Sequence, residues 1–168
     1  MMGFRYAYEN CPQTDYFILV DDDYYVSTLN TLKALPQDEK SIFYGGTVHI
    51  NAPVSRNPFT KWYQSTKDYP YSIYPDFVSG GFIMLTKNTL HKLYLGSQFT
   101  RHFIFDDVYI GIIAYKMGIQ PINNKDCSNA KVSYDGPESY RTLVATHGYD
   151  DWTEMIKVWR ECNDLGFN

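Results

Sequence analysis

Short apolar runs alternate with polar stretches along this chain, and they predict where strands and helices form. The run at residues 16–20 holds five apolar or aromatic residues and ends at three carboxylates, Asp21, Asp22 and Asp23. A short continuous apolar run is typical of a strand buried on both faces. In open α/β sheets, ligands gather at the carboxyl ends of strands. We therefore expect a buried strand that presents an acidic cluster to a ligand.

A second buried strand is predicted at residues 77–86, where Gly80 and Gly81 would admit a close approach that a side chain would block. A shorter strand is expected at 41–44, ended by Gly45 and Gly46. Helices are expected over residues 1–10, from a cap at Ser27 or Thr28 to Leu35, from a cap at Thr86 or Asn88 to Tyr94, over 105–118 and over 151–162.

Residues 47–74 show neither the periodicity of a helix nor that of a strand, and they contain Pro53, Pro58 and Pro70. A long irregular segment inside a compact domain is usually functional or disordered. Its aromatic residues make disorder a poor explanation. We expect an ordered, functional segment that carries Phe59, Trp62, Tyr63, Tyr69, Tyr71 and Tyr74.

The composition suits one globular domain, residues 1–168, with 44% hydrophobic and 20% charged residues. Aromatic residues reach 17%, which gives weak support for a sugar ligand, because flat aromatic faces stack on sugar rings and also fill cores. The net charge of −4 argues against a nucleic-acid partner. No apolar run approaches the roughly 20 residues that cross a bilayer. The pairing of Cys11, Cys127 and Cys162 is left open.

Three features carry candidate chemistry: the acidic triplet, the pair Asp106–Asp107 and His147. Adjacent carboxylates repel one another unless a cation neutralises them. Each feature also has an ordinary explanation: a solvated acidic turn, a helix cap and a core histidine. The remaining histidines lack a neighbouring carboxylate motif, so no role is expected for His49, His91 or His102.

Taken together, the three features fit sugar transfer from a nucleotide diphosphate. That reaction needs a divalent cation at the leaving pyrophosphate and a base for the acceptor hydroxyl. Asp23 and His147 would supply oxygen and nitrogen ligands to Mn²⁺, and Asp107 would be the base. The backbone at Gly80 and Gly81 would leave room for the sugar.

Several segments resemble the β-1,3-glycosyltransferases of family 31, the galactosyltransferase family, in order and approximate spacing. Within that family the chain is most similar to the brainiac-type β-1,3-N-acetylglucosaminyltransferases. The segments are Val-Asp-Asp-Asp-Tyr-Tyr-Val at 20–26, Lys-Trp-Tyr at 61–63, the run at 74–85, Phe-Asp-Asp-Val-Tyr-Ile-Gly at 105–111, and His147 followed by Glu154, Met155 and Trp159.

This resemblance implies a GT-A-like α/β fold, a mixed sheet flanked by helices. It also implies a Mn²⁺-dependent, inverting hexosyltransferase that uses a UDP-sugar. The acceptor would be the 3-hydroxyl of a glycan on a glycolipid or glycoprotein, and the product a β-1,3 link. N-acetylglucosamine is the favoured donor sugar and galactose the next. The full-length protein is expected to be anchored in the Golgi membrane, on its lumenal side.

Position by position, the resemblance assigns a role to each candidate residue. The metal ligands correspond to Asp23 and His147, and the base corresponds to Asp107. The positions beside the nucleotide sugar correspond to Asp21, Asp22, Gly80, Gly81, Trp62, Tyr63 and Asp106.

The position of the acidic triplet is the main departure from the family pattern. In the family these acids follow a membrane anchor, a stem and the first strands of the catalytic domain, whereas here they begin at residue 21. We therefore expect the C-terminal portion of a GT-A domain, truncated at its N-terminus, with an exposed sheet edge. An inactive carbohydrate- or partner-binding fragment of the same fold is the alternative. A phosphatase-like hydrolase fits less well, because no nucleophile motif or second metal cluster is found.

Overall fold

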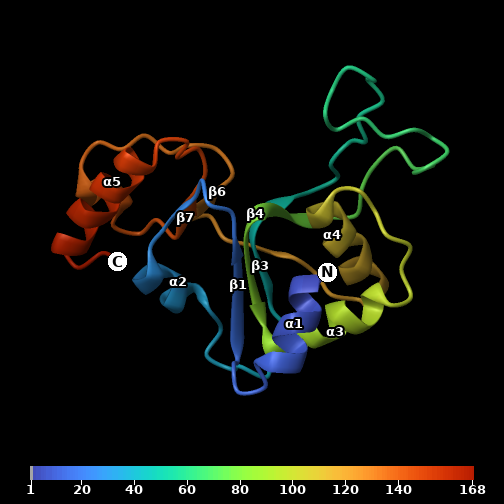
Figure 1. Cartoon of the computed structure of the whole chain (residues 1–168), viewed down its shortest axis with the longest axis horizontal. Helices are drawn as coiled ribbons and strands as arrows, with labels where there is room; N and C mark the ends of the chain where they lie inside the picture. Colours follow the sequence, from blue (N-terminus) through green and yellow to red (C-terminus); the bar gives the residue numbers. More distant parts are fainter. Residues whose placement is uncertain (1) are drawn as a thin grey trace.

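A computed structural model describes residues 2–168, which form two small sheets surrounded by helices (Figure 1). The larger sheet has the strand order β1-β4-β3-β5 and the smaller one the order β2-β7-β6. The strands of the larger sheet are β1 (Tyr16–Val20), β3 (Tyr44–His49), β4 (Phe77–Thr86) and β5 (Ile122–Asn123). Those of the smaller sheet are β2 (Tyr25–Val26), β6 (Cys127–Ser128) and β7 (Ala145–Thr146).

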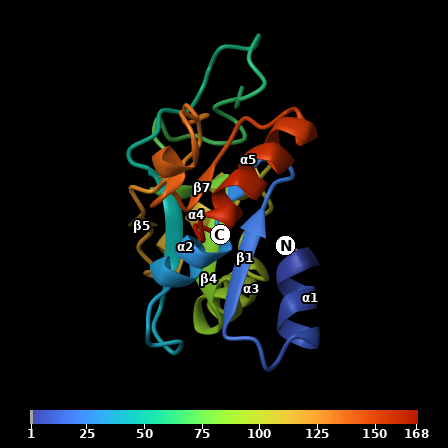
Figure 2. The same cartoon turned by 90° about the vertical axis from the view of Figure 1, so that its left-hand side faces the viewer.

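The larger sheet is mixed, because β4 pairs antiparallel with both β1 and β3 while β5 runs parallel to β3. Successive side chains of β4 point to opposite faces. On one face, Ile83 and Leu85 pack in a core with α1 (Met2–Asn10), α3 (Lys87–Ser97) and α4 (Asp106–Lys116). On the other face, Phe82 and Met84 pack against the smaller sheet. Figure 1 shows the smaller sheet on one side of the larger sheet and α1, α3 and α4 on the other, and in Figure 2 the side with the smaller sheet faces the viewer.

The remaining helices lie with the smaller sheet. They are α2 (Thr28–Ala34), the 3-10 helix η1 (Pro137–Tyr140) and α5 (Trp152–Asp164). Ser27 caps α2 as predicted, because its hydroxyl accepts a hydrogen bond from the Asn30 N–H at 3.1 Å. Asp151 caps α5 in the same way through Thr153. These caps fix where the two helices begin.

The prediction that residues 16–20 are buried on both faces is wrong. The strand forms where expected, but β1 lies at the end of the described sheet, and Ile18 and Val20 are 37% and 51% exposed. An apolar run shows that a strand forms but not how many neighbours it has. Among the described residues, β1 pairs with β4 alone, and the predicted truncation of the domain stays a prediction.

The strand predicted at 41–44 is also misplaced, because β3 spans Tyr44–His49 and includes the two glycines expected to end it. A Cβ atom on Gly46 would lie 2.5 Å from Cγ1 of Val78 and 2.6 Å from the Phe82 carbonyl oxygen. Gly46 therefore allows β3 to approach β4 closely. Similarly, α3 continues past Tyr94 to include Gly96, where a Cβ would lie 2.7 Å from Cγ2 of Ile113.

Residues 50–76, here called the aromatic loop, connect β3 to β4 and project from the body of the molecule (Figure 1). The loop is held together by its own hydrogen bonds, including a β-bridge between Pro53 and Ile73. Cys11, Cys127 and Cys162 are free thiols. Within residues 2–168, none of the helices has the length and apolar character needed to span a membrane.

Candidate active site

The acidic triplet forms a tight turn between the two sheets. The backbone N–H of Asp21 donates to the Gly81 carbonyl at 3.0 Å, which ties the turn to β4. The carbonyl of Asp23 accepts from the Tyr149 N–H at 3.0 Å, which ties the turn to the chain after β7. Three consecutive carboxylates are thereby fixed where β1 ends and β2 begins.

Asp23 and His147, the two predicted metal ligands, are in direct contact with each other. The antiparallel pairing of Tyr25 with Thr146 sets these residues side by side across β2 and β7. Nε2 of His147 lies 2.9 Å from Oδ2 of Asp23. The other oxygen, Oδ1 of Asp23, is buried and has no hydrogen-bond partner. A buried carboxylate oxygen without a partner is costly, and a bound water or a cation would satisfy it.

The pair offers an imidazole nitrogen and carboxylate oxygens, which are donor types that divalent cations bind. The 2.9 Å between Nε2 of His147 and Oδ2 of Asp23 is the distance of an ion pair or hydrogen bond between the two side chains. Within residues 2–168, no group of three or more His, Cys, Asp and Glu side chains is arranged to hold a metal ion. A cation held here would therefore draw its other ligands from a substrate or from water.

Asp107 lies in the first turn of α4, facing the backbone of β4. Its Oδ2 accepts from the Gly80 N–H at 3.3 Å, and its Oδ1 accepts from the Val108 N–H at 2.7 Å. Burial raises the pKa of Asp107 above its ordinary value, and the neighbouring Asp106 adds to the increase. The two N–H groups and the imidazole of His49 oppose that increase. A carboxylate with a raised pKa is suited to accept a proton near neutral pH.

Asp21 connects the two acidic groups electrostatically. Burial raises its pKa first, followed by the negative charges of Asp23, Asp106 and Asp22, whereas His147 lowers it. The Asp21 carboxylate therefore interacts electrostatically with the Asp23–His147 pair and with Asp106 at the start of α4. The predicted acids and the histidine gather at one edge of the larger sheet, although they come from distant parts of the sequence.

The two glycines of β4 have different surroundings. A Cβ on Gly80 would lie 3.3 Å from Cβ of Asp107, so this glycine allows α4 to approach. A Cβ on Gly81 would lie only 2.2 Å from Cε2 of Tyr24, because the Tyr24 ring lies across it. The space expected for a sugar beside Gly81 is thus occupied by Tyr24. The Tyr24 ring also lies 5.2 Å, centroid to centroid, from His147.

Sequence reasoning missed Tyr24 and His49 at this site. Tyr24 directly follows the acidic triplet. The pair Gly80–Gly81 indicates that a bulky group packs against the β4 backbone, but the sequence does not identify that group as the Tyr24 ring. His49 ends β3, stacks on Phe77 at 4.9 Å and influences Asp107. No carboxylate stands beside His49 in the sequence, so only the pairing of β3 with β4 reveals its position.

Trp62 of the aromatic loop reaches the start of α4. Its ring contacts Phe105 edge-on at 5.4 Å between centroids, and Phe105 directly precedes Asp106. Tyr63 is 41% exposed on the same loop. The structure therefore brings Trp62 near the predicted base, and a role for either residue with the donor stays a prediction.

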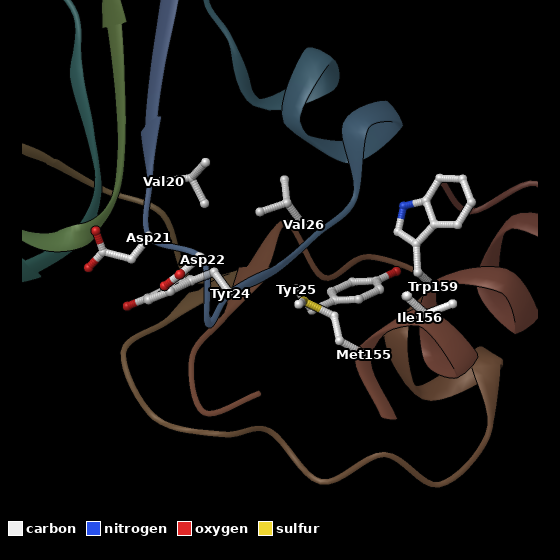
Figure 3. Close-up of a pocket in the computed structure, with 9 residues that line it drawn as sticks. All are labelled: Val20, Asp21, Asp22, Tyr24, Tyr25, Val26, Met155, Ile156 and Trp159. Atoms are coloured by element: carbon white, nitrogen blue, oxygen red, sulfur yellow. The ribbon is translucent and has the colours of Figure 1, made fainter. Parts of the chain in front are cut away.

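A separate apolar pocket of about 370 Å³ lies between the acidic turn and α5 (Figure 3). Val20, Val26, Met155 and Trp159 contribute to its walls, and Asp21 and Asp22 also line it. In Figure 3 the Asp21 carboxylate points away from the side chains of α5. Asp107 and His147 do not line this pocket, which therefore adjoins the acidic site without containing it.

Comparison with known proteins places this arrangement in a family. The sequence profile described as galactosyltransferase matches residues 1–125. The chain is 37% identical over 171 residues to beta-1,3-galactosyltransferase brn of Drosophila melanogaster, covering 99% of this chain and 52% of that protein. It is 31% identical over 169 residues to lactosylceramide 1,3-N-acetyl-beta-D-glucosaminyltransferase of Xenopus tropicalis, covering 98% of this chain and 44% of the relative.

The chain spans about half the length of these curated relatives. Among solved structures, it is similar to a glycosyltransferase involved in the glycosylation of the major capsid of PBCV-1, with a TM-score of 0.50 and 16% identity. That match covers 93% of this chain and 73% of the other. The likeness concerns the fold alone, and it confirms the expected GT-A-like α/β class.

Proposed function

This chain belongs to the galactosyltransferase family, and we propose that it forms part of an inverting β-1,3-glycosyltransferase. The enzyme would move a hexose from a UDP-sugar to the 3-hydroxyl of an acceptor glycan. The observation that carries the proposal is the contact between Asp23 and His147, with a buried carboxylate oxygen that lacks a partner. A base candidate, Asp107, stands nearby on α4.

Asp23 and His147 would hold Mn²⁺, which neutralises the charge of the departing nucleotide diphosphate when it is bound. Asp107 would take the proton of the acceptor 3-hydroxyl as that oxygen forms its bond to the anomeric carbon. The bond from that carbon to the pyrophosphate oxygen breaks, and UDP leaves with the bonding electrons. Attack from the face opposite the leaving group inverts the anomeric centre.

The remaining candidate residues would position the donor. Asp21 and Asp22 would lie beside the ribose and the phosphates. Asp106 would also lie beside the donor, next to Asp107, the proposed catalytic base. Gly80, Trp62 and Tyr63 would border the sugar, whereas the Tyr24 ring lies across Gly81. Asp21 supports this assignment because it interacts with both acidic groups.

Donor and acceptor are proposed from the relatives. One relative is named as a galactosyltransferase and another as an N-acetylglucosaminyltransferase acting on lactosylceramide. N-acetylglucosamine is the first donor to test and galactose the second, with a glycolipid carrying terminal galactose as the first acceptor. The full-length protein would act on the lumenal side of the Golgi membrane, where such acceptors are extended.

Calorimetry of the purified chain with UDP, with and without MnCl₂, tests the proposal first. We expect UDP binding that requires Mn²⁺, followed by transfer in a donor screen with a β-1,3 linkage in the product. The second candidate is a non-catalytic carbohydrate- or partner-binding fragment of the same fold. It predicts no Mn²⁺-dependent UDP binding, and that result would replace the enzyme proposal.

A further inference from the structure

Another pocket, of about 240 Å³, lies where the base of the aromatic loop meets the far end of α4. Asn51 and Asp76 line it from the two ends of the loop, and Tyr115 lines it from the last turn of the helix. At a rise of about 1.5 Å per residue, Tyr115 stands roughly 12 Å along α4 from Asp107. The pocket is therefore separate from the candidate active site.

The polar side chains of this pocket have unused hydrogen-bonding capacity. Oδ1 of Asp76 accepts from the Asn51 N–H at 2.9 Å. Within residues 2–168, Oδ2 of Asp76 and the side-chain amides of Asn51 and Gln120 make no hydrogen bond to the protein. A carboxylate oxygen accepts hydrogen bonds, and an amide both donates and accepts them. The pocket thus presents donors and acceptors to the hydroxyl groups of a ligand.

The backbone holds these polar groups in place. Asn51 has a φ of 50°, in the left-handed region, which asparagine adopts more readily than most other residues. Its N–H bonds Asp76, and the Tyr74 N–H donates to the Ala52 carbonyl at 2.9 Å, so the start of the aromatic loop is tied to its end. Residues held in sparsely populated backbone conformations cluster at ligand sites. The preorganised arrangement lowers the entropy cost of binding.

The remaining walls of the pocket are apolar. Pro75, Ile119 and Pro121 line it, together with Tyr115, whose side chain is 70% exposed. An exposed aromatic ring offers a flat face on which the apolar face of a sugar ring can stack. Amide and carboxylate groups beside such a ring suit a ligand that has an apolar face and several hydroxyl groups.

The charge of the pocket narrows the class of ligand. Within residues 2–168, Asp76 is the one charged side chain that lines it, and no lysine, arginine or histidine does. A nucleotide or another anion would therefore meet a carboxylate with no cation beside it in the pocket. A neutral sugar ring avoids this repulsion and can use the free oxygen of Asp76 as a hydrogen-bond acceptor.

We propose that this pocket binds one neutral hexose or N-acetylhexosamine unit of a glycan. The sugar ring stacks on Tyr115, and its hydroxyl groups bond to Asp76, Asn51 and Gln120. A single ring held by a few hydrogen bonds at the surface should bind with a dissociation constant on the order of 1 mM. That the glycan is an acceptor of the enzyme is the one part that rests on the proposed function.

Saturation-transfer NMR of the whole chain with methyl β-galactoside and methyl β-N-acetylglucosaminide, without UDP or Mn²⁺, tests the inference. We expect saturation of at least one of these sugars and none of sorbitol, which has hydroxyl groups but no ring. Tyr115→Ala should weaken binding about tenfold and Gln120→Ala about threefold. Both side chains are exposed, so the variants should keep their fold. The matched control is Tyr6→Ala, which removes a ring 65% exposed on α1 and should bind like the wild type.

Three results would overturn the inference: no saturation of either sugar, equal saturation of sorbitol, or unchanged affinity in Tyr115→Ala. Adding UDP with MnCl₂ should leave the sugar affinity unchanged, and competition by UDP would instead assign the sugar to the candidate active site and overturn the inference too. A chain whose sugar binding depends on Tyr115 but that transfers no sugar would refute only the proposed function. Sugar transfer together with binding that does not depend on Tyr115 would refute only the inference.

Discussion

Replacing Asp107 by asparagine separates proton transfer from substrate binding. The amide keeps the size of the carboxylate, and its oxygen can still accept the 2.7 Å bond from the Val108 N–H. The NH₂ group then faces the Gly80 N–H, so the longer bond of 3.3 Å is lost, at a cost of about 1 kcal/mol. Loss of a general base lowers turnover by about 10²- to 10⁴-fold.

The pH dependence has a defined sign. Because burial raises the pKa of Asp107, the folded protein keeps this proton at pH values where the unfolded chain has lost it. Stability therefore falls as the pH rises from the ordinary carboxyl pKa through the raised one. Asp107→Asn has no carboxylate to ionise at this position, so its stability does not fall as the pH rises through the raised pKa. Above that pH, this gain in stability relative to the wild type offsets the loss of the hydrogen bond. Turnover of the wild type should fall as the pH drops through the raised pKa.

Initial rates with a UDP-sugar, calorimetry with UDP and MnCl₂, and thermal unfolding would be measured on both proteins. We expect a large loss of turnover with nucleotide affinity and melting temperature nearly unchanged. Asp164→Asn, an exposed carboxylate at the end of α5, is the matched control and should behave like the wild type. Undiminished turnover in Asp107→Asn would remove Asp107 from the role of base.

Other substitutions test other parts of the site. His147→Ala should lower Mn²⁺-dependent UDP affinity at least about tenfold by calorimetry, and unchanged affinity would rule out the metal role. Gly81→Ala should cost about 1–3 kcal/mol in urea denaturation because its methyl group meets the Tyr24 ring; Gly3→Ala, which meets no atom within 4 Å, should change stability by at most about 1 kcal/mol in the favourable direction. Asn30→Ala removes hydrogen bonds to the Arg141 and Leu143 carbonyls at 2.9 and 3.0 Å, so the free energy of unfolding should fall by about 1–3 kcal/mol, unlike that of the exposed Asn163→Ala.

Local patterns in the sequence predict the elements that local forces decide. The apolar runs locate β1 and β4, and Ser27 and Asp151 mark where two helices begin, because a short polar side chain can satisfy the first free N–H groups. Chemistry and family resemblance predict that Asp23 and His147 bind one metal ion; the structure brings the two side chains into contact, and the metal stays a prediction. It depends on strands of only two residues, which carry no periodic signal of their own.

Contacts between distant segments decide the features that could not be predicted. Gly45 and Gly46 have the sequence signature of a turn, yet they lie inside β3 because β4 packs closely against Gly46. The Tyr24 ring fills the space at Gly81, and no local sequence pattern around either residue predicts this contact. The approach of His49 to Asp107 likewise follows from strand register.

Among the described residues, no strand pairs with the outer edge of β1, and this has a thermodynamic consequence for the acids that follow it. The turn is held by the Asp21 N–H on the Gly81 carbonyl and by the Tyr149 N–H on the Asp23 carbonyl, so a further contact along the outer side of β1 would stiffen it. A polypeptide that added a strand there would restrict the same turn that is proposed to receive the nucleotide. By reciprocity, each would bind more tightly in the presence of the other. The gain in affinity for the added strand and the gain in affinity for the nucleotide would then have the same magnitude, because both equal one coupling free energy.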